Sequence, residues 1–145
     1  MASRVGQGRP HNAAMVGHRG SSDAAAAAAT RAAVLDHIDA FNAHDADRLF
    51  AGLHRDVVWA TGSDVFQGTP QLRAELFDDG LWAMRPSLVA RTLLIDGEAA
   101  AGIFHEVLTV AEEARAFDIA VFFTVCGGLI RKVKVFRAGS ADIEP

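Results

Sequence analysis

The stretch that most constrains the fold is residues 34–62, in which helical patterns run into a strand pattern. Val34, Ile38 and Phe41 recur at spacings of four and three residues, which predicts an amphipathic helix with one buried stripe. His37 falls three residues after Val34 and four before Phe41. We therefore expect its side chain to lie on or beside that buried stripe.

A polar joint separates this helix from the next elements. Residues 42–45 break the helical pattern, and Asp45 is a favourable N-cap for a second helix over 46–53. The run 57–61 is rich in β-branched and aromatic residues, which predicts a strand, and Gly62 ends it. The domain therefore opens with a helix, a joint, a short helix and a strand.

The rest of the domain shows one more helical pattern and then a series of strands. Thr69 and Pro70 mark a strong helix start, and Gly80 is placed to end that helix. Strand patterns follow, separated by turns, over 88–95, 99–110, 117–125 and 130–137. Three helices followed by strands in meander order predict an α+β domain, in which a curved antiparallel sheet wraps around the three helices.

The length of 145 residues is enough for one domain with a sizeable core. Residues 1–22 lack helical or strand periodicity, so we expect a disordered tail there, with the first helix starting at Ser22 or Asp23. The domain then covers 23–138, and 139–145 form a C-terminal tail. Because the first residues lack the apolar core of a secretory signal, a cytoplasmic location is expected.

The composition argues against several classes of partner. Half of the residues are apolar and the net charge is -4, with no basic block that would neutralise the phosphates of a nucleic acid. No run of 18 or more apolar residues predicts a membrane span. The single cysteine, Cys126, excludes an internal disulfide. The six histidines show no HxH or HExxH spacing, so no metal site and no cofactor are expected.

Three short motifs resemble, in order and spacing, those of one known family. FNAHD at 41–45 looks like an F/L-N-x-x-D joint, FQG at 66–68 is similar to an F-x-G segment, and CGGLI at 126–130 resembles a D-G-K-I turn. These motifs are common in the SnoaL-like and nuclear-transport-factor-like superfamily, and the resemblance covers about residues 25–137. It implies a cone with a deep apolar pocket, which commonly dimerises through the outer face of the sheet.

Members of this superfamily include ketosteroid isomerases, polyketide cyclases, scytalone-type dehydratases, epoxide hydrolases and proteins without catalysis. The resemblance places the isomerase base at Thr61, which cannot accept a proton near neutral pH, and the oxyanion tyrosine at His37. The second isomerase acid falls near Ala120 or Val121, and neither side chain can donate a proton. The known isomerase constellation is therefore not expected in this chain.

The other known constellations are incomplete as well. The Tyr–Asp pair of the dehydratases corresponds to Phe41 and Asn42, and their sheet histidine falls at about Thr92. Arg91 and Asp96 lie near the epoxide hydrolase strand, but the Arg-x-Asp spacing is absent. A polyketide cyclase typically requires only one acid–base residue in an apolar pocket, so the sequence remains compatible with a cyclase.

Side-chain alternation along the strands selects candidate catalytic residues. On 99–110, His105 is expected to face the pocket and Glu106 to face away. His37 and His105 are candidates because histidine titrates near neutral pH, although each could instead be a core-edge histidine with a satisfied hydrogen bond. Asp118 is a third candidate, on a strand whose two faces both look apolar, so its orientation stays open. The expected ligand-binding residues are Phe41, Asn42, Trp59, Thr61, Trp82, Thr92 and Thr109.

The same alternation predicts an apolar outer face. If His105 faces inward, Phe104 and Leu108 lie on the outer face, beside Phe122 or Phe123. An apolar sheet face that no helix covers usually meets a partner, so a homodimer through this face is expected.

Two functions are compatible with these observations. The first is a SnoaL-like small-molecule enzyme: a cyclase, isomerase or dehydratase that acts on an apolar polyketide-like or terpenoid substrate by acid–base chemistry without a cofactor. The alternative is a non-catalytic protein that binds an apolar small molecule in the same pocket.

Overall fold

The computed structural model describes the backbone of residues 13–137 and the side chains from Ser22 onward. The helical elements of the first half are α1 (Ala13–Asn42), α2 (Ala46–Ala51), α3 (Thr69–Gln71), the π-helix η1 (Leu72–Leu81) and the 3-10 helix η2 (Trp82–Met84). The strands are β1 (Leu53–Thr61), β2 (Asp64–Gln67), β3 (Ser87–Asp96), β4 (Ala99–Val110), β5 (Glu113–Cys126) and β6 (Leu129–Arg137).

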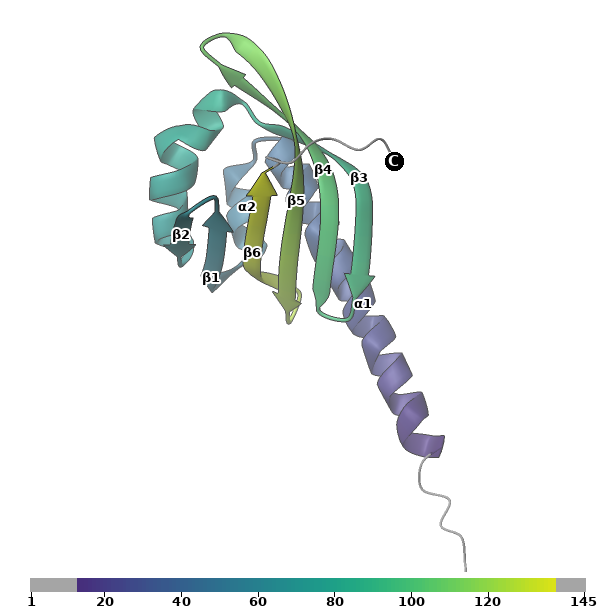
Figure 1. The fold of residues 1–145 in the computed structure, drawn as a ribbon. Helices are drawn as coiled ribbons and strands as arrows, with labels where there is room; N and C mark the ends of the chain where they lie inside the picture. The colour runs from purple at the N-terminus through teal and green to yellow at the C-terminus, as the bar shows by residue number, and fades with distance from the viewer. Residues whose placement is uncertain (1–12, 138–145) are drawn as a thin grey trace, which may run out of the picture.

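The six strands form one curved sheet in the order β2-β1-β6-β5-β4-β3 (Figure 1). All neighbours pair antiparallel except β1 and β6, which run parallel. The predicted α+β class and the curved sheet around N-terminal-half helices are confirmed. The parallel pair was not predicted, because nothing in a meander pattern shows that the last strand returns to lie beside the first.

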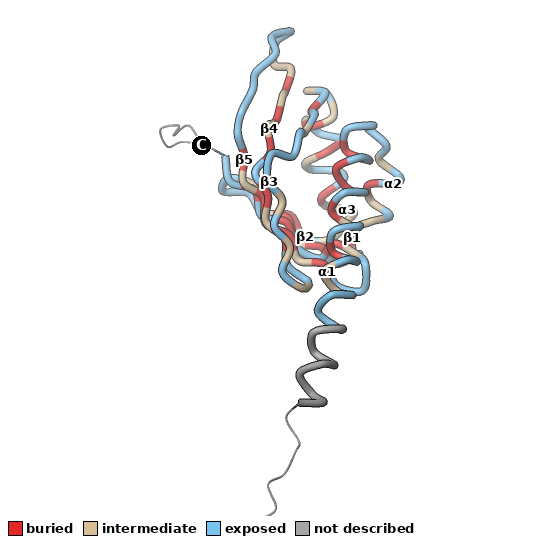
Figure 2. Tube along the Cα trace, turned by 90° about the vertical axis from the view of Figure 1, so that its right-hand side faces the viewer, coloured by how far each residue is buried: buried red, intermediate tan, exposed pale blue. Residues whose placement is uncertain are grey.

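The core lies between the helices and the concave face of the sheet, while none of the described helices covers the opposite face (Figure 2). The predicted stripe of α1 is fully part of this core, since Val34, Ile38 and Phe41 are all buried. Alternate residues of the central strands pack on that side of the sheet. Phe104 of β4 and Phe123 of β5 are among the largest of these buried side chains. Burial of this apolar surface is the main term that stabilises the fold.

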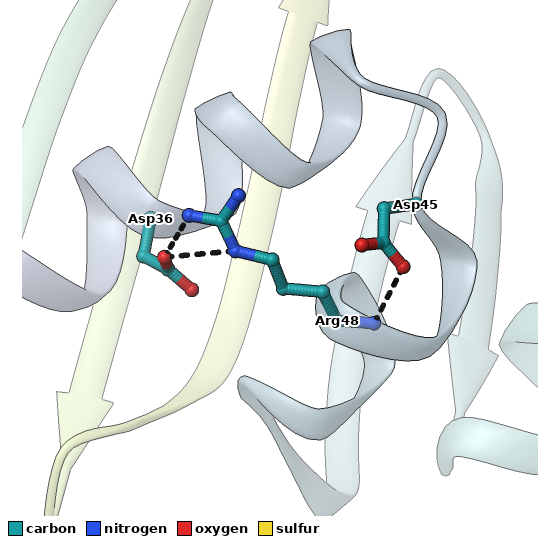
Figure 3. Close-up of polar contacts among 3 residues, drawn as sticks. All are labelled: Asp36, Asp45 and Arg48. Carbon is teal, nitrogen blue, oxygen red and sulfur yellow. Dashed lines mark hydrogen bonds and ion pairs between the residues drawn. The ribbon is translucent and has the colours of Figure 1, made fainter.

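The joint between α1 and α2 is held by two polar contacts of Arg48 (Figure 3). Its backbone N–H donates to Asp45 Oδ1 at 3.1 Å, so Asp45 caps α2 as predicted. Its guanidinium pairs with Asp36 on α1, with Nε 3.1 Å from Oδ1. Arg48 therefore ties the two helices together at the surface.

Asn42, the last residue of α1, fastens the helix to the sheet. Its Nδ2 donates to the Leu88 carbonyl at 2.8 Å, and its Oδ1 accepts from the Leu88 N–H at 2.7 Å. The side chain thus bonds both backbone groups of Leu88, as a neighbouring strand would at the start of β3. This double contact gives the asparagine of the joint motif a structural role.

Several boundaries differ from the sequence prediction. Helix α2 ends at Ala51, two residues early, while β1 begins at Leu53 and β5 at Glu113, each four residues early. Helix α1 begins at Ala13, so its first turns occupy part of the stretch expected to be a disordered tail. The rest of that tail, 1–12, and the expected C-terminal tail, 139–145, lie outside the described residues. The third helix continues through Gly80 to Leu81 and has π geometry from Leu72 onward. Turns of π-helix are frequent at functional sites.

Candidate functional site

A cavity of about 120 Å³ lies between the helices and the concave face of the sheet. Most of its wall is apolar and aromatic, and the polar side chains in the wall are few. The lining residues that matter below are His37, Phe41, Trp59, Thr61, Glu106 and Arg137. An apolar cavity with a few convergent polar groups is the usual form of a small-molecule site.

Glu106 supplies a carboxylate to this cavity from β4. Its side chain is buried, with 3% of the residue surface exposed, and it forms an ion pair with Arg137 at the end of β6. Arg137 is partly exposed, so one end of the pair is open to water. Because a buried carboxylate is costly without a partner, this contact explains how Glu106 is tolerated inside.

His37 supplies the second titratable group, from the buried side of α1. Only 5% of its surface is exposed, and its ring packs against Trp59 and Phe123, with centroids 5.7 and 6.1 Å away. Burial lowers the pKa of His37 to about 4, and the nearby Asp36 carboxylate opposes the effect only in part. The imidazole is therefore neutral at physiological pH. Its Nδ1 has no hydrogen-bond partner among the described residues.

His105 faces outward, opposite to the orientation expected from the sequence. On β4 it is Phe104, Glu106 and Leu108 that are buried. The expectation that Phe104 and Leu108 lie on the outer face is therefore wrong. The alternation misled because both sets of alternate residues in β4 are mainly apolar, with Glu106 in one and His105 and Thr109 in the other, so neither set looks clearly exposed.

The structure brings His105 and Asp118 together, but on the outer face. The two residues are directly opposite each other on β4 and β5, with His105 Nδ1 3.0 Å from Asp118 Oδ1. Arg91 of β3 approaches the same carboxylate at 3.9 Å. The hydrogen bond from His105 holds the pKa of Asp118 below its usual range; partial desolvation opposes this, and Arg91 adds to it. The open orientation of 117–125 is thereby settled, since Ile119 faces inward and Asp118 outward.

The residues expected to bind the ligand fall into two groups. Phe41, Trp59 and Thr61 line the cavity. The other four are absent from its wall: Asn42 binds Leu88, Trp82 packs in an aromatic cluster beside the cavity, and Thr92 and Thr109 are on the outward side of their strands. A bulge between Ala90 and Thr92 shifts the alternation of β3 by one residue, which places Thr92 opposite Ile103 on the outer face.

Glu106 and Arg137 are the charged cavity residues that the sequence reasoning missed. For Glu106, one local signal was available, at Gly102 on the same strand. A Cβ at Gly102 would lie 2.5 Å from the Phe104 ring, so the glycine makes room for that side chain on the concave face. A glycine inside a strand often marks such a close approach. It would have assigned the set containing Phe104 and Glu106 to the interior.

The arrangement offers acid–base chemistry in an apolar setting. A carboxylate can accept a proton, and a neutral imidazole can donate a hydrogen bond or a proton. Among residues 22–137, no group of three His, Cys, Asp or Glu side chains gathers in a way that would hold a metal ion. Of the helices in the described part of the chain, none combines the length and apolarity needed to cross a bilayer.

No family model and no curated protein sequence matches the chain. Among solved structures, it is similar to a proposed ketosteroid isomerase from Kribbella flavida, with 26% identity, a TM-score of 0.67, and 82% of this chain and 84% of that chain covered. An LEH-like epoxide hydrolase from M. tuberculosis gives 19% identity, a TM-score of 0.69 and coverage of 77% and 84%. A proposed polyketide cyclase from Sinorhizobium meliloti gives 17% identity and a TM-score of 0.62, with 72% of this chain and 93% of that chain covered.

These neighbours, and others described as NTF2-like, share the cone architecture. The chain therefore has the fold of the SnoaL-like and nuclear-transport-factor-like superfamily, as the three motifs predicted. Identities this low assign neither a reaction nor a substrate to the chain, because this fold hosts many functions.

Proposed function

We propose that the protein is a SnoaL-like enzyme that works by acid–base chemistry, without a cofactor, on an apolar polyketide-like or terpenoid small molecule. The observation that carries the proposal is that one apolar cavity is lined by both a buried carboxylate, Glu106, and a buried neutral imidazole, His37. The similarity to a proposed ketosteroid isomerase and a proposed polyketide cyclase supports the same class of chemistry.

The two residues take complementary roles. Glu106 removes a proton from a carbon next to a carbonyl group, and the electron pair of the broken C–H bond moves into the carbonyl to form an enolate. His37 donates a hydrogen bond to the enolate oxygen, as a neutral imidazole can. The proton on Glu106 then returns to another carbon in an isomerase, or goes to a departing hydroxyl as water in a dehydratase. In a cyclase, the enolate carbon attacks a second carbonyl and Glu106 protonates the resulting alkoxide.

Exchange of the acidic C–H for deuterium tests this proposal, since it requires only the first step. A panel of cyclic ketones and 1,3-diketones would be incubated with the protein in heavy water and followed by NMR. Glu106→Gln is expected to slow the exchange of an active compound by about 10²–10⁴-fold, the usual contribution of a general base. His37→Phe is expected to slow it by about 10²–10³-fold.

The matched control is His105→Ala, because His105 lies on the opposite face of the sheet. This variant is expected to exchange at the wild-type rate. Wild-type exchange in Glu106→Gln would refute the catalytic assignment. If no compound exchanges but the same compounds raise the melting temperature, the alternative function as a non-catalytic binding protein is supported.

We also propose that the protein forms a homodimer through the outer sheet face. Six large apolar side chains are exposed there: Val65, Val89, Leu94, Ile103, Phe122 and Phe136. Phe122 and Phe136 pack edge to face with centroids 5.8 Å apart. Within residues 13–137, no helix lies over this face of the sheet (Figure 2). A patch of this kind on a sheet commonly meets a partner.

A further inference from the structure

Three polar side chains of the cavity wall come from the same end of the sheet. β4 and β6 each pair antiparallel with β5 and therefore run in the same direction, and β1 runs parallel to β6. Arg137 is the last residue of β6, Thr61 is the last residue of β1, and Glu106 lies in the second half of β4. All three line the cavity. A molecule bound there would meet a pair of charges at this end.

Arg137 has hydrogen-bonding capacity that Glu106 does not use. The contact between the two joins Arg137 Nη1 to Glu106 Oε1, and it is the one hydrogen bond that the Arg137 side chain makes within residues 22–137. A guanidinium carries several N–H donors, spread over its three nitrogens. The side chain is 39% exposed, whereas that of Glu106 is 4% exposed. The guanidinium is therefore the member of the pair that an incoming molecule can approach.

Protonation of Glu106 removes the counter-charge of Arg137. In the proposed reaction, Glu106 accepts a proton from carbon and becomes neutral. The electron pair of the broken C–H bond leaves a negative charge on the carbonyl oxygen of the substrate. The guanidinium keeps its positive charge throughout, because it does not deprotonate in proteins. Arg137 therefore loses its partner in the step in which the substrate gains a negative charge.

The new charges are complementary, and the cavity offers the enolate no other fixed cation. Arg137 is the only Arg or Lys among the lining residues. An unpaired charge is costly in an apolar site, so both the guanidinium and the enolate gain from pairing. Because the guanidinium is already held at the cavity wall by β6, little reorganisation is needed when the charge develops.

We propose that Arg137 is a further catalytic residue, which pairs with Glu106 in the resting protein and with the enolate oxygen of the substrate once Glu106 has taken the proton. The inference rests on the proposed function, because Glu106 must be the base, but it does not depend on His37. It predicts that the cavity binds the anion of a carbon acid when Glu106 carries no charge.

Glu106→Gln reproduces the charge of the protonated side chain, since the amide is neutral and nearly equal in size. The probe is 1,3-cyclohexanedione, which is ionised to its enolate at pH 7. Its single ring suits a cavity of about 120 Å³, because an apolar protein cavity of about 150 Å³ holds benzene. Cyclohexanone is the uncharged probe with the same ring. Both are titrated by calorimetry or NMR.

Glu106→Gln is expected to bind the enolate about 10–100-fold more tightly than the wild type, the effect of a hydrogen bond to a charged group. The double variant Glu106→Gln, Arg137→Gln is expected to lose this gain. Glu106→Gln, Arg137→Lys keeps a cation and is expected to retain part of it. Cyclohexanone is expected to bind all four proteins with similar affinity.

Equal affinity of the wild type and Glu106→Gln for the enolate would overturn the proposal, and so would the absence of enolate binding to Glu106→Gln. A gain that persists in the double variant would overturn it as well, because the gain would then come only from the loss of repulsion by Glu106. Glu106→Ala removes the same charge and replaces Glu106→Gln in these titrations if the latter does not fold.

The titrations measure affinity alone, so they are independent of turnover. A gain that requires Arg137, together with wild-type deuterium exchange in Glu106→Gln, would retain Arg137 as the group that binds the anion and reject Glu106 as the base. Slow exchange in Glu106→Gln without any gain in affinity would retain the base and reject the role of Arg137.

Discussion

Arg137 reaches across β5 to pair with the carboxylate of Glu106, although 31 residues separate the two along the chain. Within residues 22–137, Glu106 is the one acidic side chain that is buried. The contact joins β4 to β6, which are not neighbours in the sheet, and it places a fixed negative charge at the wall of the cavity.

Removal of Arg137 leaves that charge uncompensated. Arg137→Gln is expected to lower the free energy of unfolding by about 1–3 kcal/mol, less than for a fully buried pair because the guanidinium is partly exposed. The double variant Glu106→Gln, Arg137→Gln is expected to recover part of this loss, since no buried charge remains. Urea unfolding at pH 7 measures both. Strictly additive effects in the double variant would show that the two residues do not interact.

Protonation of His37 is expected to destabilise the protein in mild acid. The pKa of its side chain is 6.5 without perturbation and about 4 in the fold, so between these values the unfolded chain binds more protons. The contribution of His37 to the free energy of unfolding therefore rises with pH across this window. The two pKa values correspond to a loss of roughly 3 kcal/mol below pH 4.

Comparison with His37→Phe isolates this effect from the other groups that titrate in acid. Urea unfolding of both proteins between pH 4.5 and pH 7 gives the difference between their free energies of unfolding. This difference is expected to shift in favour of the variant as the pH falls. A constant difference would mean that His37 titrates at the same pH in the folded and unfolded chain.

Loss of the Asn42 side chain is expected to loosen the end of α1. Asn42→Ala removes two hydrogen bonds to Leu88, and water replaces part of them because the site is exposed, so a loss of about 1–2 kcal/mol is expected. Asn42→Asp keeps the acceptor for the Leu88 N–H but loses the donor. Its free energy of unfolding is expected to lie between those of the wild type and Asn42→Ala. Thermal or urea unfolding ranks the three proteins. Equal stability of Asn42→Ala and the wild type would contradict the role of this contact.

A charge in the middle of the outer face is expected to separate the proposed dimer. Phe122→Asp places a carboxylate among the exposed apolar side chains of that face. Leu35→Asp is the matched control, because Leu35 is an exposed apolar residue on α1 instead. Size-exclusion chromatography with light scattering is expected to show a dimer for the wild type and for the control, and a monomer for Phe122→Asp. A wild type that is monomeric at micromolar concentration would refute the proposal.

His105→Ala is expected to raise the pKa of Asp118 toward its ordinary value, because the hydrogen bond from His105 is the main cause of the lowered pKa. Arg91 stays near the carboxylate and is expected to keep part of the effect. NMR titration of the side-chain carboxyl carbon follows the change. An unchanged titration would indicate that the two side chains do not pair in solution.

Much of the architecture could be predicted because it depends on local signals. The stripe of Val34, Ile38 and Phe41, the cap at Asp45 and the strand over 99–110 each follow from short-range spacing and propensity. The same reasoning placed His37 beside the core, while the family resemblance placed Thr61 at the pocket. In these cases, one face of the element is clearly apolar or one residue has a strong local preference.

Alternation alone did not give the orientation of β4, because both of its faces carry apolar side chains, and only the glycine at 102 distinguishes them. Ile103 and Val107 lie on the outward side, so the usual contrast between a buried and a solvated face is weak. Glu106 is tolerated inside only because of Arg137, and no local pattern indicates a partner so distant in sequence. The bulge in β3 added a second error of the same kind, at Thr92.

The position of β6 between β1 and β5 also has a consequence for biosynthesis. As the chain leaves the ribosome, β1 and β2 are complete long before the strand that joins them to β3, β4 and β5 has been made. The sheet can close only once Leu129–Arg137 has emerged, and such non-local pairing slows folding. Until then the aromatic wall of the cavity is open to water and the carboxylate of Glu106 has no counter-ion. A chain truncated before residue 137 would lack Arg137, and the apolar surface of its unfinished cavity would be exposed to chaperones.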